Sequence, residues 1–240
     1  MTVLVVGASG ATGRLLVDQL LGRSVSVKVI VRPQATLPAN FVNREHLTII
    51  RAAVSTLDDA ELARHVLGCD ATASCLGHNM SLKGIYGQPR RLVADATRRL
   101  CKAVETSRPE HPVKFVLMNT AGNSNRALSE RVSLGEQCVI GLIRLLVPPH
   151  VDNETAADVL RVDIGQDHQD VEWVVVRPDS LTNADVVTAY DEHPSPVRSA
   201  IFNPGSTSRI NVAHFMAELI TNRSTWARWK GQMPVIYNRT

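Results

Sequence analysis

The stretch TVLVVGASGATG, residues 2–13, decides the fold of this chain. Its first part, Thr2–Val6, is a run of apolar and β-branched residues, which is typical of a buried strand. Three glycines follow at once, and an apolar pattern typical of a helix continues to about Leu21. A strand, a glycine-rich turn and a helix in direct succession form the first half of a βαβ unit.

The same alternation continues along the chain. Further strands are predicted at Val25–Val31, Leu47–Arg51, Ala71–Leu76, Val113–Asn119, Val171–Arg177 and Pro234–Tyr237, and helices at Leu57–Leu67, Gln88–Thr106 and Val212–Thr221. Continuous apolar strands separated by helices indicate a parallel sheet that is covered on both faces. We therefore expect an α/β fold, a Rossmann-type doubly wound parallel sheet. Residues 1–240 would form a single domain with a small C-terminal extension on the substrate side.

Three segments fit this alternation least, and we expect them to form the substrate side: about 78–90, 123–155 and 178–210. Loops of this kind carry function without a readable code. They bound a pocket for a small-molecule substrate.

The composition excludes several classes of protein. The chain has 240 residues, 44% hydrophobic and 20% charged, with a net charge of +3, which is ordinary for a globular domain. The basic residues are scattered, so we expect no nucleic-acid partner. The longest apolar stretch, Cys138–Val147, is interrupted by Arg144 and is too short to span a membrane. We expect a cytoplasmic monomer or homodimer.

The four cysteines form no CxxC pair, and no histidine cluster has the spacing of metal ligands. We therefore expect reduced, mostly buried thiols and no metal.

The glycine loop has the spacing GxxGxxG, which differs from the GxGxxG of ordinary dehydrogenases but serves the same physical purpose. The first glycine permits a tight turn, the second lets the backbone approach a pyrophosphate, and the third lets the helix pack on the sheet. Backbone N–H groups at the start of the helix then face the phosphates, and the Ser and Thr hydroxyls add donors. The residues expected to bind the diphosphate are Gly7, Ser9, Gly10, Ala11, Thr12 and Gly13.

The end of the second strand indicates which dinucleotide binds. An acidic residue there would take the ribose hydroxyls of NAD, whereas an arginine suits the 2′-phosphate of NADP. This chain has Arg32, with no acidic residue before Glu45. We therefore expect NADP(H), with NAD(H) less favoured. The alternative for Arg32 is a solvent-exposed charge at a strand end.

The chain resembles the atypical short-chain dehydrogenases/reductases, in particular the NAD(P)H-binding group of NmrA-like proteins and biliverdin reductase B-like flavin reductases. The motifs that carry the resemblance are GASGATG at 7–13, IVRP at 30–33, CLG at 75–77, VKFVLMNTAG at 113–122, VEWVVVRPDSL at 171–181 and RINVAHFMAELI at 209–220. The resemblance implies that Leu76 and Gly77 lie along the cofactor ribose and Thr120 beside the nicotinamide. Arg177 and Pro178 would close the far side of the pocket.

Two features depart from this family. Members of this family often have an aspartate after the third strand, near the adenine. Here that stretch is RAAV, residues 51–54, and we expect Val54 to contact the cofactor. The Tyr-x-x-x-Lys pair is absent, and its place holds His150 to Glu154. Such a pair donates a proton to a carbonyl oxygen, so its absence disfavours ordinary alcohol–ketone chemistry.

These observations favour an NADPH-dependent oxidoreductase that transfers hydride to a small planar acceptor such as a flavin, quinone or enone. The cofactor would carry the chemistry, and the protein would orient the acceptor. Thr120 would hydrogen-bond the acceptor, and His78 is the candidate proton donor. Tyr86 shares the loop of His78 and is the third catalytic candidate. For His78 and Tyr86 the alternative is a purely structural loop residue.

Two other functions remain open. One is a non-catalytic NADP(H)-sensing regulator of NmrA-like type. Its partner surface would be the apolar stripe of Val132, Val139, Ile143 and Leu146, although such a stripe is more often core or pocket wall. The other is an epimerase, dehydratase or isomerase, for which we identify no base in the sequence.

Overall fold

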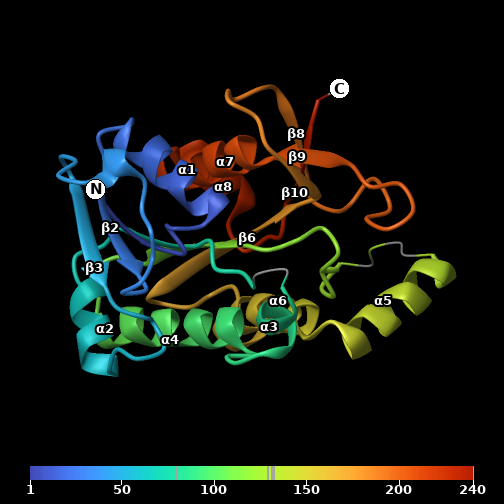
Figure 1. Ribbon diagram of the computed structural model, residues 1–240, viewed down its shortest axis with the longest axis horizontal. Coiled ribbons are helices and arrows are strands. Elements are labelled where there is room, and N and C mark those ends of the chain that lie inside the picture. The colour runs from blue at the N-terminus through green and yellow to red at the C-terminus, as the bar shows by residue number, and fades with distance from the viewer. Residues whose placement is uncertain (79–80, 129, 131–132, 240) are drawn as a thin grey trace.

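The computed structural model describes residues 1–78, 81–128, 130 and 133–239. Its centre is an eight-stranded sheet in the order β3-β2-β1-β4-β5-β6-β10-β8 (Figure 1). The strands are β1 (Thr2–Val6), β2 (Ser26–Val31), β3 (Leu47–Arg51), β4 (Ala71–Ser74), β5 (Val113–Met118), β6 (Val171–Pro178), β8 (Tyr190–His193) and β10 (Val235–Asn238). Neighbours pair in parallel, except that β8 runs antiparallel to β10. The predicted doubly wound Rossmann-type sheet is confirmed.

Helices cover both faces of the sheet, with α1, α7 and α8 on one side and α2, α4 and α6 on the other (Figure 1). The helices are α1 (Ala11–Leu21), α2 (Asp59–Val66), α3 (Leu82–Tyr86), α4 (Leu92–Ser107), α5 (Leu134–Leu146), α6 (Pro148–Asp158), α7 (Arg209–Thr221) and α8 (Arg223–Trp229). A π-helical turn, Val159–Ile164, extends α6, and a 3-10 turn spans Ala39–Phe41. A second, two-stranded sheet pairs β7 (Ser180–Thr182) with β9 (Ser206–Ser208).

The core lies in two layers because successive strand residues point to opposite faces. On β1, Val3 and Val5 pack with α1 and α7, whereas Leu4 and Val6 pack with α2 and α4. All four side chains are fully buried. This explains why the strand is apolar throughout rather than alternating.

The sheet order reverses at β1, which lies between β2 and β4. The chain passes outward from β1 to β3 and then returns to the other side of β1. In such sheets, ligands bind in the crevice at the carboxyl ends of the strands where the order reverses. Here that crevice lies beside Gly7, which follows β1, and Cys75, which follows β4.

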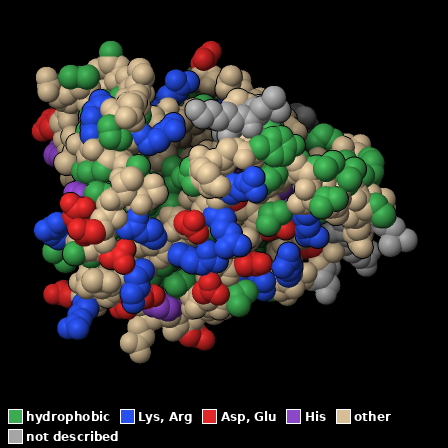
Figure 2. Space-filling model, turned by 60° about the horizontal axis from the view of Figure 1, so that its bottom comes forward, with side chains coloured by type: hydrophobic (Ala, Val, Ile, Leu, Met, Phe, Trp, Pro, Cys, Tyr) green, Lys and Arg blue, Asp and Glu red, His purple; other side chains and the backbone are tan. Residues whose placement is uncertain are grey.

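Helix α5 differs most from the expectation. Leu142, Leu145 and Leu146 on this helix are 56%, 78% and 51% exposed, and Val139 and Ile143 are only half-buried. The interpretation of the stripe as core is therefore wrong for Leu146, and Val132 lies outside the described residues. The helix projects from the body of the molecule (Figure 1), and hydrophobic side chains gather at that end of an otherwise charged face (Figure 2).

Some element boundaries also differ from the prediction. Helix α4 begins at Leu92 rather than at Gln88, and α7 begins three residues earlier than expected, at Arg209. The four cysteines are free thiols, and Cys138 on α5 is exposed. Over the described ranges, no helix has the length and apolar character needed to cross a membrane.

Candidate functional site

The glycine loop packs against the end of β4 so closely that it admits no side chain. Gly7 has a φ of +79°, and a Cβ there would lie 2.5 Å from the carbonyl carbon and oxygen of Cys75. A Cβ on Gly13 would lie 2.2 Å from the Gly7 carbonyl oxygen. Both contacts are with backbone, which cannot rotate away. The loop geometry therefore requires glycine at both positions.

The same loop leaves an anion cradle at the start of α1. Gly10 caps the helix without a side-chain hydrogen bond, and no acidic residue lies in the first turn. The N–H groups of Ala11, Thr12 and Gly13 have no partner within the helix, because the first turn has no preceding carbonyls. Gly77, across the crevice, has open space where a side chain would stand. The geometry and charge of this cradle fit a diphosphate.

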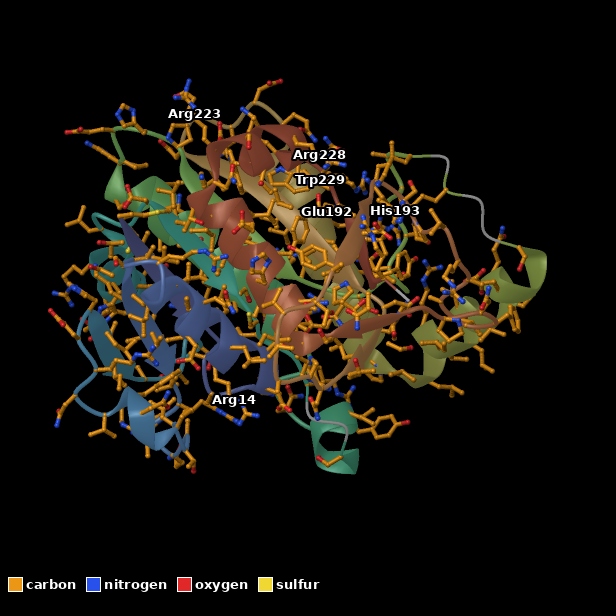
Figure 3. All side chains as sticks on the ribbon, turned by 90° about the horizontal axis from the view of Figure 1, so that it is seen from above. Arg14, Glu192, His193, Arg223, Arg228 and Trp229 are labelled. Carbon is orange, nitrogen blue, oxygen red and sulfur yellow. The ribbon has the colours of Figure 1, made fainter. Side chains whose placement is uncertain are left out.

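Arg32 lies at the crevice, exposed at the carboxyl end of β2, and its guanidinium has no hydrogen bond or ion pair with any described residue. Arg51, on the neighbouring β3, donates to the carbonyl oxygens of Pro33 and Ala35 at 3.2 and 3.0 Å. Arg51 thereby fixes the turn that follows Arg32. Arg14 projects from the first turn of α1 (Figure 3). The end of the crevice next to β2 and β3 is therefore positively charged.

Thr120 follows β5 at the same edge of the sheet. Its hydroxyl accepts a hydrogen bond from the Gly122 N–H at 3.3 Å, and its own N–H donates to Asn119 Oδ1 at 2.9 Å. Asn119 Nδ2 donates in turn to the Asn153 carbonyl on α6 at 2.8 Å. These contacts hold the Thr120 loop between the sheet and α6.

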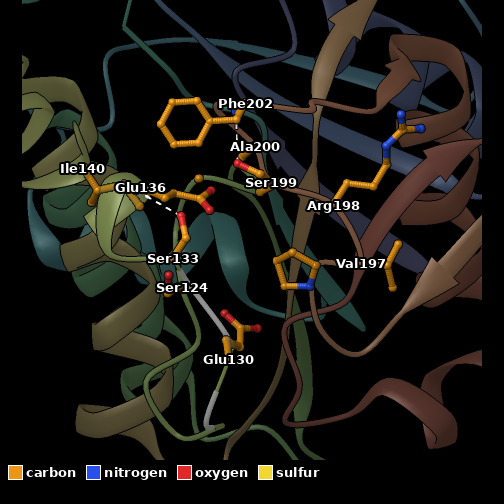
Figure 4. Close-up of a pocket in the computed structure, with 13 residues that line it drawn as sticks. Ser124, Glu130, Ser133, Glu136, Ile140, Val197, Arg198, Ser199, Ala200 and Phe202 are labelled. Carbon is orange, nitrogen blue, oxygen red and sulfur yellow. Dashed lines mark hydrogen bonds between the residues drawn. The ribbon is translucent and has the colours of Figure 1, made fainter. Parts of the chain in front are cut away.

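A cavity of about 490 Å³ begins directly beyond Thr120, at Ala121 and Gly122. The first turn of α5 forms one wall, and residues 196–202 form the other (Figure 4). Phe202 joins the two walls, because a Cβ on Gly135 would lie 3.8 Å from its ring. This cavity lies within two of the three segments predicted to form the substrate side.

A buried ion pair organises that cavity. Arg177 on β6 is fully buried, and its guanidinium lies 2.7 Å from Glu130, which lines the cavity. The same guanidinium donates to the carbonyls of Asn123, Pro194 and Met233 at 2.8, 3.2 and 2.6 Å. Arg177 is thus a structural anchor for three loops.

His78 and Tyr86 hold elements together and do not line the cavity. His78 Nδ1 lies 3.1 Å from the Gly84 carbonyl and Nε2 lies 2.7 Å from Asp152 Oδ2, so both ring nitrogens are engaged. Asp152 also accepts the N–H groups that begin α4. The Tyr86 hydroxyl donates to the Leu146 carbonyl at 3.0 Å, which ties α3 to α5. Their catalytic roles stay predictions.

Of the remaining predicted cofactor residues, Leu76 and Pro178 follow strands at the edge of the sheet that carries the crevice, whereas Val54 lies in the core. Leu76 is half-buried and directly follows Cys75. Val54 is buried and packs in the core with α2, and its carbonyl accepts a hydrogen bond from Arg99. Pro178 is buried at the end of β6, and its carbonyl accepts the Ala121 N–H at 2.9 Å.

His150 is a site residue that sequence reasoning did not select. It lies in the first turn of α6, and the point where Gly122 would carry a Cβ is 3.7 Å from its Cε1 and 3.8 Å from Thr120 Oγ1. Its Nε2 lies 3.3 Å from Glu154 Oε1, without the alignment of a hydrogen bond. The signal was available, since the two residues have the spacing of the missing Tyr-x-x-x-Lys pair.

Glu154 is held as a carboxylate. Burial raises its pKa, but the close contacts and positive charges of His150 and Arg144 outweigh burial and bring the pKa to about 2. Arg144 donates twice to this carboxylate, from Nε at 2.9 Å to Oε2 and from Nη2 at 2.7 Å to Oε1. A permanently negative Glu154 keeps the His150 ring oriented beside Thr120.

Cys75 lies against the glycine loop, but its thiol is a poor nucleophile. Burial raises the pKa of its thiol to about 12. Its Sγ lies 3.9 Å from the sulfur of Met216 on α7, inside the core.

The chain matches the family described as NAD(P)H-binding over residues 7–223. This protein belongs to the NAD(P)H-binding family. No curated protein matches the chain. The match agrees with the glycine cradle described above, and it extends from that loop through α7.

Solved structures share the fold of this family member at low sequence identity. A short-chain dehydrogenase/reductase from Veillonella parvula, solved in complex with NADP, has a TM-score of 0.71 and 16% identity, covering 99% of this chain and 94% of that one. A protein from Streptococcus pneumoniae, proposed to be an NADH-flavin reductase, has a TM-score of 0.67 and 14% sequence identity, and the match covers 100% of both chains. A proposed NAD-dependent epimerase/dehydratase from Bacillus halodurans has a TM-score of 0.69 and 19% sequence identity, and the match covers 100% of this chain and 94% of that one.

Proposed function

We propose that this NAD(P)H-binding protein is an NADPH-dependent oxidoreductase that transfers hydride to a small planar acceptor. The observation that carries the proposal is the cavity that opens directly beyond Thr120, at the same edge of the sheet as the glycine cradle. A protein that only stored a dinucleotide would have no need of a second cavity beside the reactive end of the site. The name of the Streptococcus pneumoniae neighbour, a proposed NADH-flavin reductase, supports the same class of acceptor.

In this proposal the residues of the chain bind the cofactor, orient the acceptor and protonate the reduced product. When bound, the reduced nicotinamide supplies the hydride. The Thr120 hydroxyl donates a hydrogen bond to the acceptor, and His150 beside it supplies a proton to the reduced product. We favour His150 over His78 for this role, because both ring nitrogens of His78 are already engaged.

The proposal is tested by mixing the protein with NADPH and a panel of flavins, quinones and enones, and following the nicotinamide absorbance. We expect turnover of at least one class. Thr120→Val, which removes only the hydroxyl, should slow turnover about 10-fold or more while leaving NADPH affinity unchanged. Tight NADPH binding without turnover of any acceptor would contradict the oxidoreductase and favour the sensor.

The sensor is supported by one feature of its own. The exposed leucines of α5 form an apolar surface on a projecting helix, and such surfaces often contact another protein. A sensor would bind NADPH and a protein partner without consuming the cofactor.

We further propose that the preferred dinucleotide is NADP(H), with Arg32 binding the 2′-phosphate. Arg32→Ala should weaken NADPH binding by about 10- to 100-fold and leave NADH binding unchanged, because the lost contact is a charge-assisted hydrogen bond. Dissociation constants from the quenching of protein fluorescence give both values. Arg64→Ala, an exposed arginine on α2, is the matched control for the loss of one positive charge. Equal losses for NADPH and NADH would contradict the assignment.

A further inference from the structure

Glu136 places a carboxylate at the wall of the cavity beyond Thr120. The residue is only 9% exposed and lies in the first turn of α5. Its N–H donates to Ser133 Oγ at 3.2 Å, but its carboxylate has no hydrogen bond or ion pair with any described residue. Figure 4 shows this carboxylate pointing into the space between α5 and the segment that carries Ser199 and Ala200. A carboxylate that faces a cavity without a protein partner attracts a positively charged ligand.

The other charged groups of the cavity do not neutralise Glu136. Glu130 already pairs with Arg177. Arg198 is exposed, donates to Asn203 Oδ1 at 2.9 Å, and points away from Glu136 (Figure 4). His150, behind Gly122, pairs with Glu154. Among the residues that the structure describes, the unpaired charge that faces a ligand at this wall is therefore the carboxylate of Glu136.

The apolar part of the cavity suits a planar, positively charged ligand. Ile140 is buried on the wall formed by α5, and Phe202, 62% exposed, lines the mouth of the cavity from the facing segment. These two side chains offer an apolar surface to a planar ring system. A positive charge also gains from the face of an aromatic ring, in addition to its attraction to a carboxylate.

We propose that the acceptor taken by this cavity is a planar compound that carries a positive charge, with Glu136 as the side chain that recognises it. This inference rests on the proposed function, because it treats the cavity as the acceptor site. It also predicts what is rejected. Phosphorylated and other anionic acceptors, the flavin nucleotides included, would face the carboxylate of Glu136 and bind poorly. The inference therefore narrows the acceptor classes of the proposed function to members without a phosphate group.

The test uses three naphthoquinones that differ only in a side chain carrying a trimethylammonium, a neutral or a sulfonate group. Their dissociation constants are measured by calorimetry on the protein saturated with NADP⁺, so that no turnover is needed. We expect the cationic compound to bind at least about 10-fold more tightly than the sulfonate, with the neutral compound between them. In Glu136→Gln the three values should converge to within about 3-fold.

Glu110→Gln is the matched control, because Glu110 is exposed on the loop between α4 and β5. It should keep the wild-type order, and NADP⁺ affinity should be unchanged in both variants. The proposal is overturned if the three compounds bind equally or not at all, or if Glu136→Gln keeps the preference. If the order is as expected but NADPH reduces none of the compounds, the recognition by Glu136 stands and the oxidoreductase proposal fails.

Discussion

Gly13→Ala is expected to abolish dinucleotide binding and to lower the free energy of unfolding by about 3 kcal/mol or more. The new Cβ would lie 2.2 Å from the carbonyl oxygen and 2.8 Å from the carbonyl carbon of Gly7, and 3.0 Å from Ala8 Cα. All three atoms belong to the backbone of the loop. Relief requires that the loop and the start of α1 separate, which removes the N–H groups that face the phosphates.

Two glycines of the same chain provide graded controls. A Cβ on Gly10 would meet only the Gly7 carbonyl oxygen, at 3.2 Å, so Gly10→Ala should be milder. Gly141 on α5 has no atom within 4 Å of its Cβ position, and Gly141→Ala should stabilise the fold by about 0.5–1 kcal/mol. Denaturant unfolding and NADPH fluorescence titration measure both effects. Wild-type stability and affinity in Gly13→Ala would refute the loop geometry.

Arg177→Met is expected to lower the free energy of unfolding by about 3–5 kcal/mol. The substitution leaves Glu130 buried without its charge partner, and three loop carbonyls lose their donor. The damage should concentrate on the acceptor cavity, since Glu130 lines it, while the glycine cradle at the far end of the crevice keeps its geometry.

The double variant Arg177→Met/Glu130→Gln separates the charge from the packing. Because the glutamine is neutral, it should recover at least about 1 kcal/mol of the loss. Chemical denaturation of the single and double variants gives the two free energies. If the double variant is no more stable than Arg177→Met, the ion pair is not the main contribution of Arg177.

The sequence predicts those helices and strands whose buried side chains are apolar and whose exposed side chains are polar. Strands β1, β5 and β6 are buried over most of their length on both faces and therefore read as largely apolar runs. Strand β8, with the sequence YDEH, carries no such run because it is an antiparallel strand at the sheet edge. Helix α6 was not predicted because its inward face includes Asp152 and Glu154, which are buried with partners. Hydropathy cannot distinguish such residues from exposed ones.

The site divides in the same way. The glycine loop could be predicted because its requirements are local, a turn and a close approach within seven residues. The cavity could not, because Gly122, Glu136 and Phe202 meet only through tertiary packing. The role of Arg177 also depends on tertiary packing. The sequence predicts that it closes the far side of the pocket, whereas in the structure it is a buried anchor for three loops.

The high pKa of Cys75 has a consequence for the tolerance of the protein to the acceptors proposed above. Quinones and enones are electrophiles that add to thiolates, and at pH 7 a thiol of pKa about 12 is ionised in about one molecule in 100,000. Burial also raises the pKa values of Cys69 and Cys101. Of the four cysteines, all of which lie in the described part of the chain, only Cys138 on α5 is exposed. Self-inactivation by an electrophile would therefore begin at this peripheral helix and leave the cofactor cradle unmodified.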